Sequence, residues 1–179
     1  MKVTFNKLSV ITIILMGYAG VSGAATSTQV NISGTVNATT CDISADKPIV
    51  NLGNVLPTAF TAANTPVASS EQHIKISMTN CSGTKAANGQ AAIKVTGPVT
   101  NSGATYFGND PTSEVGISLR NGSADIANND VINMGNAGDE LVDMSKLVLD
   151  VTTSLKSSTS TVTGGKSITA PVNFAFVYN

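Results

Sequence analysis

Apolar and polar residues alternate at every second position in segments spread along the whole chain. In residues 73–79, for example, Ile74, Ile76 and Met78 alternate with polar side chains, and the pattern recurs at 93–96, 115–120, 147–155 and 172–178. A period of two places successive side chains on opposite faces of a β-strand, so each segment is predicted to be a strand with one face in the core. Residues predicted on the opposite, water-facing side include Lys75, Ser118, Arg120, Asp150 and Ser154.

Turn-forming residues separate the predicted strands. Asn88-Gly89, Asn121-Gly122 and Gly164-Gly165 tolerate the positive φ angles that tight turns require. Residues 54–70 and 123–144 do not alternate, and we expect them to be long surface loops. No segment has a helical period, so several short strands joined by turns indicate an all-β sandwich or barrel. A chain of 179 residues suits one such domain.

The first 24 residues have the features of a secretory signal peptide. Two lysines precede an apolar stretch of 14 residues, 8–21, and Ser22-Gly23-Ala24 supplies the small residues of a cleavage site. A helix that crosses the hydrocarbon core needs about 20 residues, which disfavours a retained membrane anchor. We therefore predict cleavage after Ala24, export of residues 25–179, and no membrane insertion of the mature chain.

Export places the two cysteines of the chain in an oxidising compartment. Cys41 and Cys81 are therefore predicted to form a disulfide. A metal or redox pair would need a Cys-x-x-Cys spacing or histidine partners, and the single His73 lies on the polar face of a predicted strand. Continued alternation places Cys81 off the apolar face of its strand, so the bridge is expected at a sheet margin and not in the centre of the core.

The sequence offers no convincing catalytic or ligand-binding group. Its 10 basic residues are scattered, which argues against nucleic acid as a partner. Residues 163–167 resemble the end of a phosphate-binding loop, but Ser160 stands where that pattern needs glycine. Asp139, Glu140 and Asp143 lack the spacing of a calcium-binding loop, and a solvated acidic loop is the preferred interpretation. No catalytic, cofactor or metal site is assigned, and we do not expect an enzyme.

Both ends of the predicted mature chain alternate. The C-terminal segment is the most aromatic of the predicted strands, and its apolar face consists of Val172, Phe174, Phe176 and Tyr178. A face of this kind is expected to be covered. The N-terminal segment carries Thr26, Thr28, Val30 and Ile32 on one side. It could form the first strand of its own domain or complete a sheet in another molecule, because unpaired strand edges are templates for strand addition.

At these residues the sequence resembles the pilin subunits of chaperone–usher fimbriae, especially major rod subunits similar to the type 1 pilin. Four segments carry the resemblance: 34–41, from Gly34 to Cys41; a strand at 50–55; 74–81, which ends at Cys81; and the ending 174–179 with its penultimate tyrosine. Together these segments span the predicted mature chain.

The resemblance implies an all-β, incomplete immunoglobulin-like sandwich that lacks its last strand and is completed by a donor strand from a neighbouring subunit, one of the known modes of β-strand addition. It divides the chain into a signal peptide at 1–24, a donor-strand extension at 25–34 and a pilin domain at 35–179. The donor residues would be Thr26, Thr28, Val30 and Ile32, with Gly34 closing the segment. The strand with Val172, Phe174, Phe176 and Tyr178 would border the groove and contact the chaperone.

The implied function is that of a structural pilus subunit that polymerises by donor-strand exchange into surface filaments used in adhesion. The implied partners are a periplasmic chaperone, an outer-membrane usher, copies of the same chain and other pilus subunits. The implied location is the fimbrium at the cell surface. The alternative is a minor, adaptor or adhesive single-domain subunit. Thr28 departs from the family pattern, which usually has glycine there, so the acceptor pocket is roomier or insertion is weaker.

Overall fold

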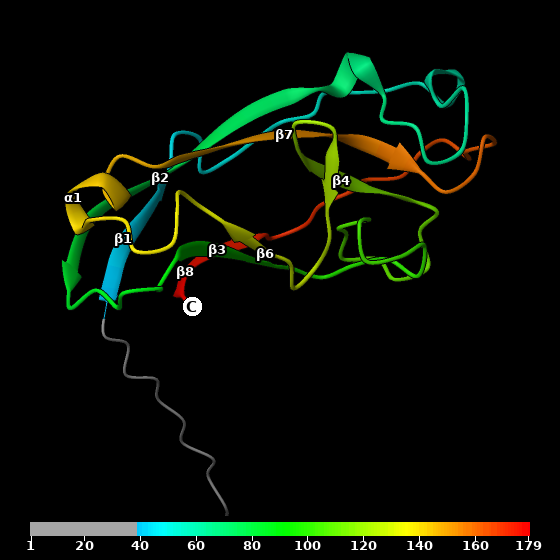
Figure 1. Ribbon diagram of the computed structural model, residues 1–179. Helices are drawn as coiled ribbons and strands as arrows, with labels where there is room; N and C mark the ends of the chain where they lie inside the picture. The colour runs from blue at the N-terminus through cyan, green and yellow to red at the C-terminus, as the bar shows by residue number, and fades with distance from the viewer. Residues whose placement is uncertain (1–38) are drawn as a thin grey trace, which may run out of the picture. The chain divides into compact units, whose positions relative to one another are not determined.

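The computed structural model describes residues 39–179 (Figure 1). The predicted signal peptide at 1–24 and the predicted donor segment at 25–34 lie outside the described residues. The strands are β1 (Thr39–Ala45), β2 (Gln72–Gly83), β3 (Ala91–Thr96), β4 (Val115–Asn121), β5 (Ala124–Ile126), β6 (Val131–Asn133), β7 (Val148–Ser157) and β8 (Asn173–Tyr178). The helical turns are η1 (Pro57–Ala59), η2 (Ala68–Ser70) and α1 (Leu141–Met144).

The paired strands are antiparallel and form two sheets. The larger sheet has the order β1-β2-β7-β4-β5, and the smaller has the order β6-β3-β8. Ile76 and Val151 of the larger sheet share one core cluster with Ile93 of the smaller sheet, and all three side chains are at most 1% exposed. The two sheets therefore pack face to face (Figure 1), which confirms the predicted all-β sandwich.

The alternating segments are strands, as predicted, but the loop predicted at 123–144 is wrong. This stretch contains β5, β6 and the single turn of α1, and it buries Ile126, Met134 and Met144. A strand of three residues is too short to show alternation in sequence, and its formation depends on the neighbouring strand. Residues 54–70 are a loop with two short 3-10 turns, yet Phe60 and Val67 are buried there in a second small core.

The predicted water-facing side of β4 and β7 is buried in part, although Asp150 at the start of β7 is exposed as predicted. Ser118 and Ser154 are fully buried, and Lys156 is 2% exposed. Lys156 Nζ donates to Asp125 Oδ2 at 2.8 Å and lies 4.6 Å from the centre of the Tyr106 ring. The loop that carries Tyr106 therefore covers this face of the sheet, and an ion pair and a cation–π contact replace the hydration of the lysine. Alternation alone cannot reveal a loop that folds over a sheet.

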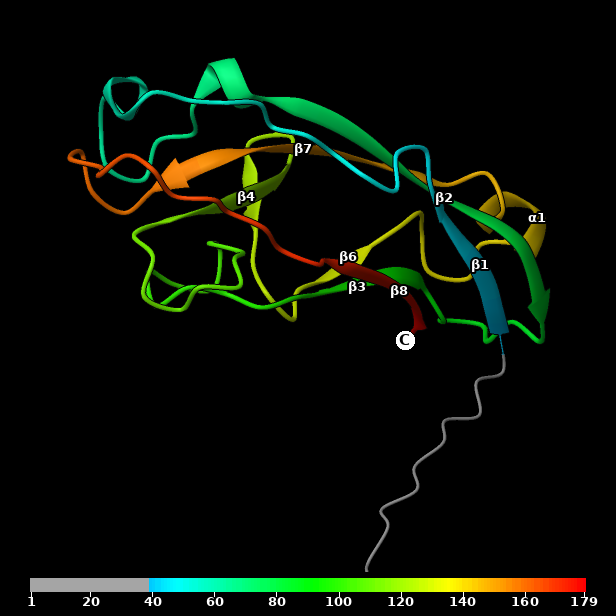
Figure 2. The ribbon, with the colours of Figure 1, turned by 180° about the vertical axis from the view of Figure 1, so that it is seen from behind.

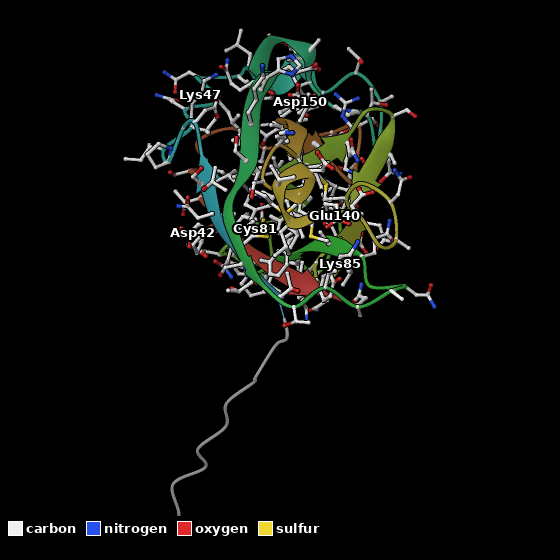
Figure 3. The ribbon with its side chains drawn as sticks, turned by 60° about the vertical axis from the view of Figure 1, so that its left-hand side comes forward. Asp42, Lys47, Cys81, Lys85, Glu140 and Asp150 are labelled. Carbon is white, nitrogen blue, oxygen red and sulfur yellow. A yellow bond between two sulfur atoms is a disulfide. The ribbon has the colours of Figure 1, made fainter. Side chains whose placement is uncertain are left out.

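The expected disulfide joins Cys41 of the edge strand β1 to Cys81 near the end of β2, with an S–S distance of 2.03 Å (Figure 3). The prediction that Cys81 lies off the core face is wrong. Asn80 has a φ of 51°, and the pairing of β1 with β2 shifts register at this point. The extra residue is a β-bulge, which moves the alternation of β2 by one position and turns Cys81 toward the core.

Replacing both cysteines by serine is expected to destabilise the domain by about 4 kcal/mol, because the bridge closes a loop of about 40 residues on the chain-entropy model. The measurement is thermal unfolding, together with the yield of soluble protein from the periplasm. Wild-type protein under a thiol reductant is the control, since it loses the bridge without gaining hydroxyl groups. Unchanged melting and yield in the double variant would contradict the prediction.

Candidate functional site: an open strand edge and an apolar cleft

The C-terminal strand β8 is an edge strand that pairs only with β3. Gln90 and Asn179 exchange both of their backbone hydrogen bonds, at 3.0 and 3.1 Å. Because antiparallel pairs alternate between bonded and non-bonded positions, the backbone polar groups of Phe174, Phe176 and Tyr178 point away from β3. Strand β1 lies close to this free edge, but the two strands are not paired. Among residues 39–179, no strand pairs with this edge of β8, which has the unpaired groups that strand addition uses.

The apolar side chains of β8 are only partly covered. Phe174, Phe176 and Tyr178 pack against the main core, yet each remains half-buried. The rings of Phe176 and Tyr178 are stacked, with their centres 6.5 Å apart. The same residues thus combine an incompletely buried apolar face with unpaired backbone groups.

The end of β8 is fixed by Tyr178. Its hydroxyl accepts a hydrogen bond from the backbone N–H of Ala86 at 3.0 Å, and its ring lies over Gly89. A Cβ atom at position 89 would lie 2.4 Å from Cζ of Tyr178. Glycine at this position therefore allows the ring to approach the backbone of the turn before β3.

A cleft of about 850 Å³ continues the open edge beyond the start of β8. One wall is formed by residues 48–57, which follow β1, and the other by residues 162–170, which lead into β8 (Figure 2). Phe60, Val115, Ile117 and Leu155 lie between the two walls. We call the free edge of β8 and this cleft together the open groove.

Both walls of the cleft have few or no backbone partners. Within the described part of the chain, residues 47–55 make no backbone–backbone hydrogen bond, and residues 162–170 make one, from Asn109 N to Thr169 O at 2.9 Å. The strand predicted at 50–55 is therefore absent: Figure 2 shows this segment as an extended chain without an arrow. A strand needs a neighbour, and the position beside this segment is open.

The open groove has the chemistry of a site for an extended peptide. Its lining is mainly apolar, and the only charged side chain of the cleft is Lys166, which is paired with Glu114. An extended segment with alternating apolar side chains would bury them on the core side and satisfy backbone groups on both of its edges. No group of three or more acidic, histidine or cysteine side chains suited to a metal occurs among residues 39–179.

The structure brings some of the predicted site residues together and leaves others apart. Val172, Phe174, Phe176 and Tyr178 lie in sequence along one side of the open groove. The donor residues Thr26, Thr28, Val30, Ile32 and Gly34 lie outside the described residues, so their role stays a prediction. Sequence reasoning missed the wall at 162–170, whose apolar residues Val162 and Ile168 are too widely separated to signal a strand.

The groups considered for other chemistry lie outside the open groove. His73 is exposed on β2, with Nδ1 3.2 Å from the hydroxyl of Thr152. Glu140 pairs with Lys85 (Figure 3), and Asp143 pairs with Lys146.

None of the helices in residues 39–179 is long and apolar enough to cross a membrane.

Comparisons with known proteins identify a family and a fold. The family described as fimbrial protein matches residues 30–178. Among solved structures, the chain is similar to the P pilus rod subunit PapA, with 20% identity, a TM-score of 0.54, and coverage of 84% of this chain and 99% of that chain. It is also similar to a chain in a chaperone–usher pilus structure that addresses rod uncoiling, with 19% identity, a TM-score of 0.50, and coverage of 87% and 98%. No curated protein sequence matches this chain significantly.

Proposed function

Because this chain belongs to the fimbrial protein family, we propose that it is a structural subunit of a chaperone–usher pilus and polymerises by donor-strand exchange. In this proposal the open groove of one subunit accepts the N-terminal segment, residues 25–34, of the next. The similarity of the fold to a P pilus rod subunit supports the assignment to the filament.

The proposal rests on one observation: the open groove combines partly covered apolar side chains with backbone groups that have no strand partner. Phe174 and Phe176 are half-buried, and their backbone groups point to an unoccupied edge. Across the cleft, residues 47–55 also lack backbone partners. Apolar surface is costly in water, and unpaired backbone groups beside it are a template for aggregation, so one inserted strand would cover the first and pair the second on both walls.

Residues 25–34 of a second copy suit this position. The segment contains no charged residue, and Val30 and Ile32 are two residues apart, as alternate side chains of one strand face must be. Gly34 then closes the segment before the pilin domain of that second copy. We assign Thr26 and Thr28 to the same face, with Thr28 in the position where the family usually has glycine.

The proposed order, chaperone first and usher second, follows from the exposed edge of β8. A periplasmic chaperone would first cover the free edge of β8, which keeps Phe174 and Phe176 from an aggregating contact. At the outer-membrane usher, the N-terminal segment of the incoming subunit would replace the chaperone. The finished filament would then lie at the cell surface and serve adhesion.

A photo-crosslinking amino acid at position 32 tests the assignment of the donor segment. We expect crosslinks to the wall at 162–170 or to β8 of a different subunit, because Ile32 would lie inside the open groove of its neighbour. Filaments grown from mixed isotope-labelled and unlabelled subunits distinguish contacts between chains from contacts within one chain, and mass spectrometry identifies the linked peptides. The same amino acid at Asn31, on the opposite face of the segment, is the matched control and should not give these crosslinks. Crosslinks confined to a single chain would refute donor-strand exchange.

A further inference from the structure

The polar contacts of the cleft wall at residues 162–170 lead to one neighbouring loop. Asn109 N donates to Thr169 O at 2.9 Å, and Asn109 Nδ2 lies 3.3 Å from the Thr169 hydroxyl. Lys166 Nζ forms an ion pair with Glu114 Oε2. These contacts lead to residues 109–114, just before β4. Besides the packing of Val162 and Ile168 on the second small core, the wall therefore depends on this loop, whereas an ordinary strand would depend on a ladder of backbone bonds.

Packing behind the wall is incomplete. A second cavity of about 200 Å³ lies on its other side, bordered by Ser167 and Thr169 from the wall and by Asn109 and Ser113 from the loop. Val162 and Ile168 pack against the second small core at the two ends of this stretch, so the turn between them, 163–167, is the part that only polar contacts hold. Without those contacts this turn would be free to move onto the apolar floor of the cleft, because burying apolar surface is favourable.

The ion pair is well placed to resist such movement. The side chains of Lys166 and Glu114 are 36% and 24% exposed, so the pair is partly shielded from solvent. The Lys166 ammonium lowers the pKa of the Glu114 carboxyl, and backbone N–H groups of Glu114 and Thr163 lower it further. Glu114 therefore stays ionised at neutral pH and contacts the wall at two positions, 163 and 166.

We infer that Glu114 and Lys166 are positioning residues that hold the cleft open for the incoming strand. This inference rests on the proposed function. The ion pair matters while the wall has no strand beside it. Once a donor strand pairs with residues 162–170, its backbone bonds fix the wall and make the ion pair redundant. Loss of the pair should therefore slow strand uptake and leave the completed subunit unaffected.

The test uses the full-length exported subunit in its complex with the chaperone, mixed with an excess of a fluorescent peptide of residues 25–34. Lys166→Met is expected to take up the peptide about threefold to fivefold more slowly than the wild type, the range of a partly shielded ion pair. Lys166→Arg, which preserves the ion pair, should retain the wild-type rate. Asp143→Asn removes the exposed ion pair between Asp143 of α1 and Lys146, which follows the helix; neither residue lines the cleft, so this variant is the matched control.

A second measurement separates positioning from general stability. The peptide-completed forms of wild type and Lys166→Met should melt at the same temperature. Equal uptake rates in the two proteins would overturn the inference. A completed Lys166→Met form that melts below the completed wild type would also overturn it, because the variant would then be less stable in general. A wild-type subunit that takes up no peptide would instead overturn the proposed function, and the positioning role with it.

Discussion

Ile32→Asp is expected to abolish filaments while the chaperone-bound subunit still forms, whereas Phe176→Asp is expected to lose both. Full burial of a valine or isoleucine side chain is worth about 1.5–3 kcal/mol, and in the proposed assembly Ile32 gains this burial only in a neighbouring subunit. A carboxylate at position 32 would have to lose its hydration with no partner in an apolar groove. The domain that carries it would not be affected.

Phe176 has a different role because it belongs to its own domain as well as to the open groove. Its ring packs against the main core and stacks on Tyr178. A carboxylate there would disrupt the core of the isolated subunit and the edge that the chaperone would cover. Phe176→Asp should therefore lose the chaperone-bound subunit itself, before filament assembly begins.

Purification of the chaperone complex and shearing of filaments from cells measure the two stages separately. Asn31→Asp and Asn173→Asp are matched controls, because they add the same charge to the opposite face of the donor segment and to an exposed position of β8. Filaments of normal length from Ile32→Asp would rule out the donor assignment. Equal loss of the monomer complex in Ile32→Asp and Phe176→Asp would place the N-terminal segment in the sheet of its own domain.

Fusion of residues 25–34 after Asn179 through a flexible linker is expected to stabilise the subunit strongly. Insertion would cover Phe174 and Phe176 and bury Val30 and Ile32 of the fused segment. The two aliphatic side chains alone account for about 3–6 kcal/mol before the entropy of ordering the segment. For a domain of this size the melting temperature should rise on the order of 10 °C.

The decisive comparison is between fused and unfused exported chains in thermal unfolding. A fusion that carries Ile32→Asp in the added segment is the control, because it has the same length and linker and lacks one buried side chain. It should melt close to the unfused chain. Identical melting of the wild-type fusion and the unfused chain would mean that the sandwich does not accept this strand.

The alternation of apolar and polar residues correctly predicted the longer strands that have one face in the core and the other in water. Ile74, Ile76 and Met78 occupy the core face of β2 as expected, because one face of that strand meets the other sheet and the other meets water. The prediction failed at Ser118 and Ser154, where a loop from elsewhere in the chain covers the second face. Burial by a distant loop leaves no periodic signal in the strand that it covers.

Only one part of the open groove, the C-terminal strand, could be predicted from the sequence. The aromatic alternation of 172–178 marks an apolar strand whose second neighbour is not apparent, and no strand within residues 39–179 pairs with its outer edge. The cleft walls gave a misleading signal: 50–55 was predicted to be a strand and is unpaired. In the proposed assembly its pairing depends on a strand from a neighbouring subunit, which local alternation does not reveal. The position of Cys81 likewise depends on a bulge at Asn80 that interrupts regular alternation.

The contact between Tyr178 and Gly89 links two positions that are far apart in the chain. Any side chain at position 89 would displace the ring and break the hydrogen bond from Ala86 N to the tyrosine hydroxyl. Because the ring is half-buried and can rotate, the domain would accommodate such a side chain by moving the tyrosine and losing this hydrogen bond. The residues at the two positions are therefore not independent, since a substitution at 89 changes how the last residues of the chain are held.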